Sequence, residues 1–134
     1  MAADKFWGEQ EIATLLVTAS QEIKLALVLA LWTGQRQGDL LRLPCSAYDG
    51  SHLRFRQSKT GRRMTMPAGM PIRVLLDGTE RRSPLILTNS YGRPWTSDGF
   101  RTSWSKTCAL AGVRGLTFHD LRGSAVVRLA LAGR

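Results

Sequence analysis

The sequence predicts an α+β fold that is mainly α, with a small antiparallel β-hairpin or three-stranded sheet. Apolar residues recur at helical spacing near the start of the chain and fill residues 21–32 almost all round. Two later stretches, 53–56 and 63–66, alternate apolar and polar residues as half-buried strands do. The chain has 134 residues, a common size for one domain, so we expect a single domain with its own core.

Three helices are predicted before residue 45. The first presents an apolar face formed by Ile12, Leu15, Leu16 and Ala19. The second, over 21–32, should be the buried central helix, and it ends at Thr33-Gly34 because glycine adopts the left-handed conformation that ends helices. A short third helix is expected over 38–41, since Pro44 limits its continuation.

The predicted hairpin turns at Ser58 to Gly61, which reads SKTG. Gly61 suits a turn position with positive φ, and Lys59 would lie at the tip. Pro67 closes the second strand, and another short helix is expected over 72–76.

Two further helices are predicted in the last third of the chain, after a loop over 83–95. Ser97 or Asp98 is expected to cap the first of them. Its inner face would be formed by Phe100, Trp104, Cys108 and Ala111. The last helix should open near Thr117 or His119, with apolar residues spaced by four at Leu121, Ala125 and Leu129.

The charge of the chain favours a polyanionic partner. There are 19 Lys and Arg against 10 Asp and Glu, a formal net charge of +9. Between Gly50 and Leu76 there is no acidic residue, and the basic residues there are Arg54, Arg56, Lys59, Arg62, Arg63 and Arg73. A scattered charge would suit an ordinary solvated surface, but this concentration favours a surface that faces phosphate.

Several classes of protein are disfavoured by composition. The longest apolar run, from Leu25 to Trp32, is eight residues, whereas a membrane span needs about 20. Cys45 and Cys108 make neither a disulfide framework nor, with the two histidines, a set of metal ligands at suitable spacing. We therefore expect an intracellular protein with no metal, no cofactor, no membrane association and no small-molecule substrate.

Two segments carry residues suited to phosphate chemistry. Thr33 to Leu41 reads TGQRQGDLL and places Arg36 in a connection between helices, with Asp39 within pairing distance. Thr117 to Arg122 reads TFHDLR and places His119 and Arg122 on one side of a helical first turn, where an anion is favoured. Taken singly, each has a commoner structural meaning, namely an ion pair that braces a turn, a capping histidine or a solvated arginine.

Together with SKTG on the hairpin, these segments resemble the catalytic domain of the tyrosine recombinases, or phage integrases. Their order and spacing agree with that family, with 23 residues from Arg36 to Lys59 and 60 from Lys59 to His119. The resemblance covers essentially the whole chain. It implies a helical catalytic core of the tyrosine-recombinase type.

The resemblance also implies roles for these residues in attack by a tyrosine on a DNA phosphodiester. Arg36 and Arg122 would bind the non-bridging oxygens, which a planar guanidinium does with two hydrogen bonds. Lys59 would protonate the leaving 5′-oxygen, and His119 would act as general acid or base or as a donor to a phosphate oxygen. Asp39 would hold Arg36 in place, and neither metal nor cofactor would be needed. We expect Arg54, Arg56, Arg62 and Arg63 to bind DNA.

The sequence departs from the family pattern in its tyrosines. The family places its nucleophilic tyrosine after a further His or Trp motif, whereas Tyr48 and Tyr91 lie elsewhere. We therefore expect residues 1–134 to be a single, incomplete catalytic domain without a nucleophile, an N-terminal DNA-clamping domain or the C-terminal tyrosine segment.

The expected function is DNA integration or site-specific recombination through a 3′-phosphotyrosyl intermediate, in a bacterial or phage-derived protein of the cytoplasm that joins the nucleoid when bound to DNA. The expected partners are duplex DNA and other recombinase protomers. The alternative is a non-catalytic DNA-binding or regulatory module on the same scaffold. An RNA-binding protein is less favoured, since the hairpin lacks aromatic residues for base stacking.

Overall fold

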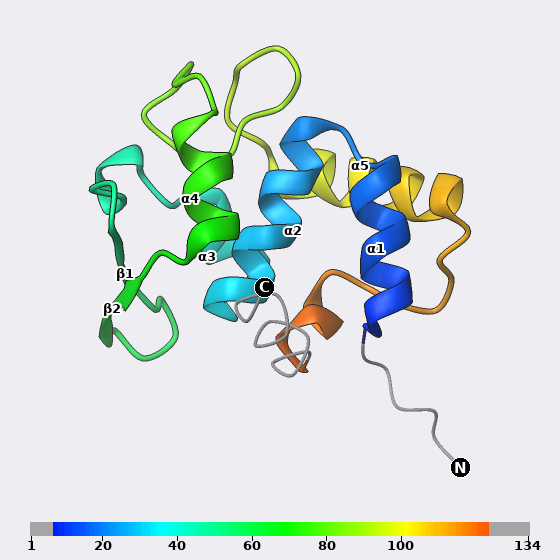
Figure 1. Ribbon diagram of the computed structural model, residues 1–134, viewed down its shortest axis with the longest axis horizontal. Coiled ribbons are helices and arrows are strands. Elements are labelled where there is room, and N and C mark those ends of the chain that lie inside the picture. Colours follow the sequence, from blue (N-terminus) through cyan, green and yellow to red (C-terminus); the bar gives the residue numbers. More distant parts are fainter. Residues whose placement is uncertain (1–6, 124–134) are drawn as a thin grey trace.

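The computed structural model describes residues 7–123, in which α-helices surround one buried helix, α2 (Figure 1). The helices are α1 (Glu9–Thr18), α2 (Gln21–Thr33), α3 (Gln37–Leu41), α4 (Met70–Asp77) and α5 (Ser97–Ala111). Helix α2 contacts α1, α3 and α4, while α5 packs against α1 and α3. Every residue from Leu25 to Leu31 is buried, which explains why α2 is apolar on nearly every side. The five helices predicted in this part of the chain are confirmed.

The ends of α2 are fixed by local hydrogen bonds and by one glycine. Ser20 caps the first turn, its side-chain oxygen accepting from the Ile23 N–H at 3.2 Å. At the other end Gly34 has φ 66°, and its N–H donates to the Ala30 carbonyl. The positive φ turns the chain sharply and brings residues 35 and 36 directly into the start of α3.

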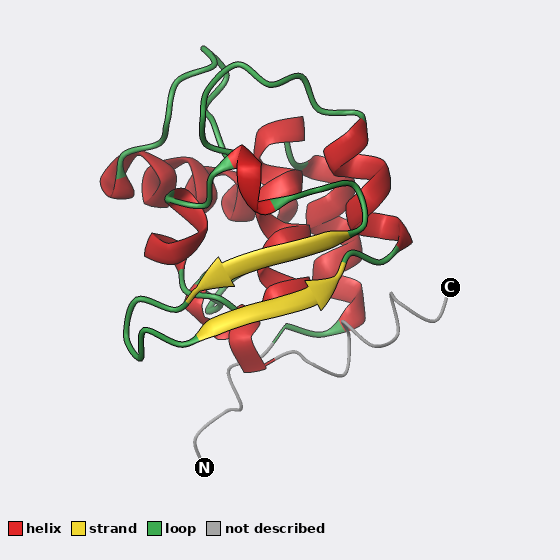
Figure 2. Cartoon of the chain, turned by 90° about the vertical axis from the view of Figure 1, so that its left-hand side faces the viewer, coloured by secondary structure: helices red, strands yellow, loops and turns green. Residues whose placement is uncertain are grey.

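The hairpin consists of β1 (His52–Arg56) and β2 (Arg63–Pro67), which pair antiparallel with Arg56 opposite Arg63. Figure 2 shows it lying against one side of the helical part. Leu53 and Phe55 face the core while Arg54 and Arg56 are exposed, as the alternation predicts. The sequence predicted either a β-hairpin or a three-stranded sheet, and the described residues form the two-stranded hairpin.

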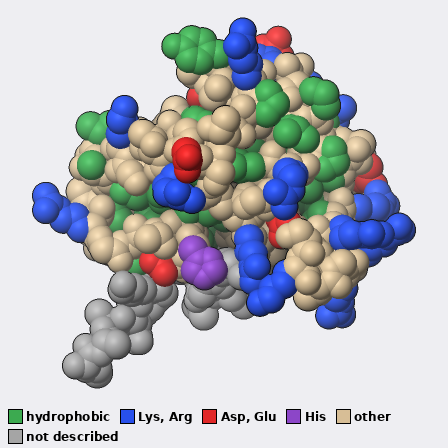
Figure 3. Space-filling view, turned by 180° about the vertical axis from the view of Figure 1, so that it is seen from behind, with side chains coloured by type: hydrophobic (Ala, Val, Ile, Leu, Met, Phe, Trp, Pro, Cys, Tyr) green, Lys and Arg blue, Asp and Glu red, His purple; other side chains and the backbone are tan. Residues whose placement is uncertain are grey.

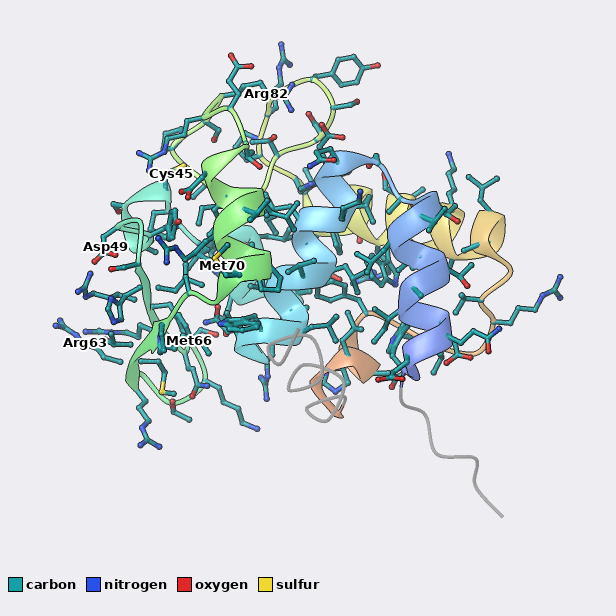
Figure 4. All side chains as sticks on the ribbon, viewed as in Figure 1. Cys45, Asp49, Arg63, Met66, Met70 and Arg82 are labelled. Carbon is teal, nitrogen blue, oxygen red and sulfur yellow. The ribbon has the colours of Figure 1, made fainter. Side chains whose placement is uncertain are left out.

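The loop between α4 and α5, residues 78–96, is held by one arginine, which Figure 4 labels. The Arg82 guanidinium donates to the carbonyls of Ser90 and Asn89 at 3.3 and 3.4 Å. It also pairs with Glu22 at 3.3 Å, near the start of α2. The loop is therefore tied back to the central helix.

An aromatic cluster joins α5 to the segments at both ends of the described chain. Its rings are Trp7, Phe100, Trp104 and Phe118, and the centroid of Phe118 lies 4.9 Å from that of Trp104. The cap predicted for α5 was wrong by one residue: Thr96, not Ser97 or Asp98, accepts from the Gly99 N–H at 3.0 Å.

The segment that follows α5 enters a 3-10 helix, η2 (His119–Gly123), which contacts α2. It begins where the last helix was predicted to open. The expected positions of Ala125 and Leu129 lie outside the described residues. Within residues 7–123, no helix is long and apolar enough to cross a bilayer.

Candidate nucleic-acid interface

Arg36 emerges from a turn that is anchored on both sides. It is the residue before the first turn of α3, and its carbonyl accepts from the N–H of Leu40 at 3.0 Å. Gln35 is only 3% exposed and Leu40 is fully buried, whereas Arg36 itself is partly exposed. The backbone that carries the guanidinium is thus fixed by buried neighbours.

Asp39 does not brace Arg36 as the sequence suggested. Its Oδ1 accepts from the Arg42 guanidinium at 3.3 Å, and no ion pair between Asp39 and Arg36 is formed in the described chain. The carboxylate side chain is only 8% exposed. Three residues along a helix separate Asp39 from Arg42, so their side chains share a face of α3, whereas Arg36 lies at its N-terminal boundary. The direct Arg36–Asp39 contact was therefore a wrong prediction.

Lys59 lies in a defined six-residue turn between the strands. The Gly61 N–H donates to the Gln57 carbonyl at 2.7 Å, and the Gln57 N–H donates to the Arg62 carbonyl at 3.0 Å. Gly61 has φ 70°, as the turn prediction required. Lys59 and both its neighbours are exposed, so the amine lies in solvent at the tip of the hairpin.

His119 is exposed between two buried anchors, Phe118 and Leu121. Thr117 and Asp120 cap this turn reciprocally, since the Thr117 N–H donates to the Asp120 carboxylate at 2.8 Å and the Asp120 N–H donates to the Thr117 hydroxyl at 3.3 Å. The backbone of Arg122 lies in η2, but its side chain lies outside what the structure describes.

Trp7 also holds this turn, because its indole N–H donates to the Thr117 carbonyl at 2.8 Å. Sequence reasoning missed this residue. Its distance of 110 residues along the chain leaves no local pattern that could have shown the contact.

Two cavities border the segment 35–39 and relate Arg36 to the other candidate residues. Gln37, next to Arg36, lines a cavity of about 730 Å³ together with His119. Gln35 and Asp39 line another, of about 410 Å³, together with Ser58, the neighbour of Lys59. The fold thus brings the motifs that carry Lys59 and His119 to the segment that carries Arg36, although neither Arg36 nor Lys59 lines these two cavities.

Exposed basic side chains gather at the end of the molecule that carries the hairpin, as Figure 3 shows. They belong to Arg54, Arg56, Lys59, Arg62 and Arg63. Figure 4 labels Arg63, which points away from the helices. Arg54 pairs with Asp49, whose carboxyl pKa is held well below its usual range by N–H groups of His52 and Ser51 and then by Arg54.

Neither tyrosine of the described chain is presented to this surface. Tyr48 is 8% exposed and its hydroxyl donates to Asp77 at 2.7 Å. Burial, and then the Asp77 carboxylate, raise the pKa of this phenol, which opposes formation of a nucleophilic phenolate. Tyr91 is exposed, but its loop lies at the opposite end of the molecule from η2 (Figure 1).

Residues 7–123 contain no cluster of three or more His, Cys, Asp or Glu side chains that could hold a metal ion. The exposed positive charge at the hairpin end is carried by arginine and lysine side chains.

Comparison with known proteins shows the family of the chain. The model of the Phage integrase family matches residues 5–134, which is nearly the whole chain. The chain belongs to the phage integrase family. A segment of 53 residues, 40% of the chain, is 43% identical to the integrase of Escherichia phage HK022.

Solved integrase structures share the fold. The catalytic core of lambda integrase superposes with a TM-score of 0.80 at 24% identity, over 95% of this chain and 84% of that one. A lambda integrase tetramer bound to a Holliday junction superposes with a TM-score of 0.72 at 26% identity, over 90% of this chain and 39% of that one. The match to the HK022 integrase covers only 15% of its length, so the chain spans part of these relatives.

Proposed function

We propose that this chain carries the phosphate-binding part of a DNA strand-exchange site, formed by Arg36, Lys59, His119 and Arg122. The observation that supports it most is the pair of cavities around residues 35–39, since one is shared with His119 and the other with Ser58, the neighbour of Lys59. Membership of the phage integrase family supports the same assignment.

The proposed chemistry is a transesterification at phosphorus. The hydroxyl oxygen of a tyrosine outside residues 1–134 gives its proton to a general base and forms a bond to phosphorus. The bond from phosphorus to the 5′-oxygen breaks, which leaves a 3′-phosphotyrosyl link and a 5′-hydroxyl. Negative charge grows on the non-bridging oxygens in the transition state, where two guanidiniums, Arg36 and Arg122, stabilise it. Lys59 gives its proton to the leaving 5′-oxygen, and His119 assists proton transfer or donates to a phosphate oxygen.

The proposed partners are duplex DNA and further recombinase protomers, with the protein in the cytoplasm and on the nucleoid. The relative solved as a tetramer on a Holliday junction supports both kinds of partner. In this assignment Asp39 contributes by fixing α3 through Arg42 rather than by touching Arg36.

The DNA-binding half of the proposal is tested by titration of a short duplex at several salt concentrations. We expect weak binding with little sequence preference and a steep dependence on salt. Arg36→Ala should lower the salt slope by about 1, as the loss of one phosphate contact does. Arg93→Ala is the matched control, because it also removes one positive charge from an exposed arginine. Arg93 lies in the loop 78–96, at the opposite end of the molecule from η2 (Figure 1). Equal effects of the two substitutions would argue against a site at Arg36.

The catalytic half separates this proposal from a regulatory module on the same scaffold. The chain alone should form no covalent adduct with a nicked substrate that traps the intermediate, since charge stabilisation cannot replace a nucleophile. A version extended by a tyrosine-bearing segment of the family should form the adduct, and Arg36→Ala in it should cost about 10²–10³ in rate. An extended protein that binds DNA and never cleaves it would favour the regulatory module.

A further inference from the structure

The smaller of the two cavities, of about 410 Å³, lies between α3 and the base of the hairpin and is unusually rich in arginine. Its polar lining consists of Gln35, Asp39, Arg42, Arg54, Arg56 and Ser58. Three guanidiniums thus face one carboxylate, so the cavity carries an excess of positive charge. None of its arginines belongs to the set assigned above to the scissile phosphate.

The arginines of this cavity retain hydrogen-bond donors for a ligand. Each guanidinium has five N–H donors. One nitrogen of Arg42 pairs with Asp39 and one nitrogen of Arg54 pairs with Asp49, which leaves the other donors of both side chains for a ligand. Their side chains are 68% and 58% exposed, which keeps the charged ends open to solvent. Arg56 is exposed and makes no ion pair within residues 7–123.

Gln35 gives the cavity a buried polar group without a partner. The residue is 3% exposed, and its side-chain oxygen accepts no hydrogen bond from any described residue. Buried polar groups are normally paired, so this buried oxygen lacks a donor that the described residues do not supply. A rotation of the amide would present its NH₂ group, which donates to anions.

The position of the cavity identifies which anion it fits. Gln35 directly precedes Arg36 and Ser58 directly precedes Lys59, so the cavity is lined by the chain neighbours of two proposed catalytic residues. Along one DNA strand the phosphates follow each other at about 3.4 Å of helix rise. A strand with one phosphate at Arg36 therefore brings neighbouring phosphates towards this cavity.

We propose that Gln35, Arg42, Arg56 and Ser58 form a second phosphate site, which binds a backbone phosphate next to the one at Arg36. This proposal rests on the proposed function. The site would set the register of the strand relative to the catalytic residues, as phosphate contacts do in protein–DNA complexes.

The first test is NMR with inorganic phosphate on the isotope-labelled chain. The side-chain NH₂ of Gln35 and the amide of Ser58 should shift saturably as phosphate is added. Arg42→Gln and Arg56→Gln should each weaken these shifts and together abolish them, whereas Arg93→Gln, which removes one charge at an exposed site in the loop 78–96, should leave them. Shifts that persist in the double variant would overturn the site.

The second test measures duplex binding against salt concentration. Arg42→Gln and Arg56→Gln should each lower the salt slope by about 1, and Gln35→Met should weaken binding with little change of slope. If Arg36→Ala reduces the slope while the Arg42 and Arg56 variants behave like Arg93→Gln, this proposal fails and the proposed function stands. If duplex DNA leaves the Gln35 signal unchanged while an acidic peptide of polyglutamate shifts it, the cavity binds a protein rather than DNA and the proposal is overturned.

Discussion

His119 and Lys59 are carried by two supports that differ in how they are packed. Phe118, next to His119, packs edge to face against Phe100 and Trp104, with ring centroids 5.1 and 4.9 Å apart. Lys59 lies in a turn whose residues, apart from the partly buried Gln57, are all exposed. A two-stranded hairpin is only marginally stable by itself. His119 is therefore held in place by the aromatic core, whereas Lys59 is held mainly by backbone hydrogen bonds in its turn.

The largest effect should come from removing the anchor beneath His119. Phe118→Ala leaves a cavity against Phe100 and Trp104 and should cost about 3–5 kcal/mol of unfolding free energy. We expect a lower midpoint in urea denaturation and broadened signals for residues 117–121. By contrast, Lys59→Ala should leave the midpoint unchanged, because the side chain is exposed. Similar losses from both substitutions would contradict the difference between the two supports.

A smaller effect should come from the conformation of the hairpin turn. Gly61→Ala puts a Cβ on a residue with φ 70°, although the space around that position is empty within 4 Å. The cost is therefore conformational, about 1–2 kcal/mol. It should appear as faster amide exchange in β1 and β2, with little change in α2. Gly61→Asn is the matched variant, since asparagine tolerates this conformation better, and it should recover part of the loss. Equal loss of protection in α2 would show that the hairpin and the core unfold together.

Two parts of the fold could be predicted well from the sequence, namely the hairpin and the central helix. The hairpin, its turn and the positive φ of Gly61 follow from local alternation and turn chemistry. Helix α2 was equally clear, because a helix that is apolar all round must be buried. Both predictions needed only neighbouring residues.

Contacts between distant residues could not be predicted in this way. The Trp7 hydrogen bond to Thr117 and the cavity between α3 and the hairpin depend on packing of segments far apart in the chain. Asp39 illustrates a subtler limit, since its spacing allows a bond to either Arg36 or Arg42, both three residues away. Only the position of the helix start decides between them, and this places Arg42 on the face of Asp39.

The last and smallest effect concerns the link between the hairpin and the helices. Tyr48 forms a bridge with Leu53 of β1, and its buried hydroxyl donates to Asp77 at the end of α4. Tyr48→Phe should cost about 1 kcal/mol at neutral pH, because one hydrogen bond is lost while packing is kept. Folding raises the pKa of Tyr48 above its ordinary value of 10.0, first through burial and then through Asp77.

Because folding raises the pKa of Tyr48, the loss of stability caused by Tyr48→Phe should depend on pH. A raised pKa means that the protonated phenol is favoured in the folded state, so its stabilising contribution is complete below about pH 10 and declines as pH rises through the folded pKa. The difference in unfolding free energy between wild type and Tyr48→Phe should therefore be constant from pH 7 to 9 and narrow above pH 10. Urea denaturation at pH 7, 9 and 10.5 measures it directly. A difference that stays constant or widens at pH 10.5 would mean that the hydroxyl does not couple the hairpin to α4.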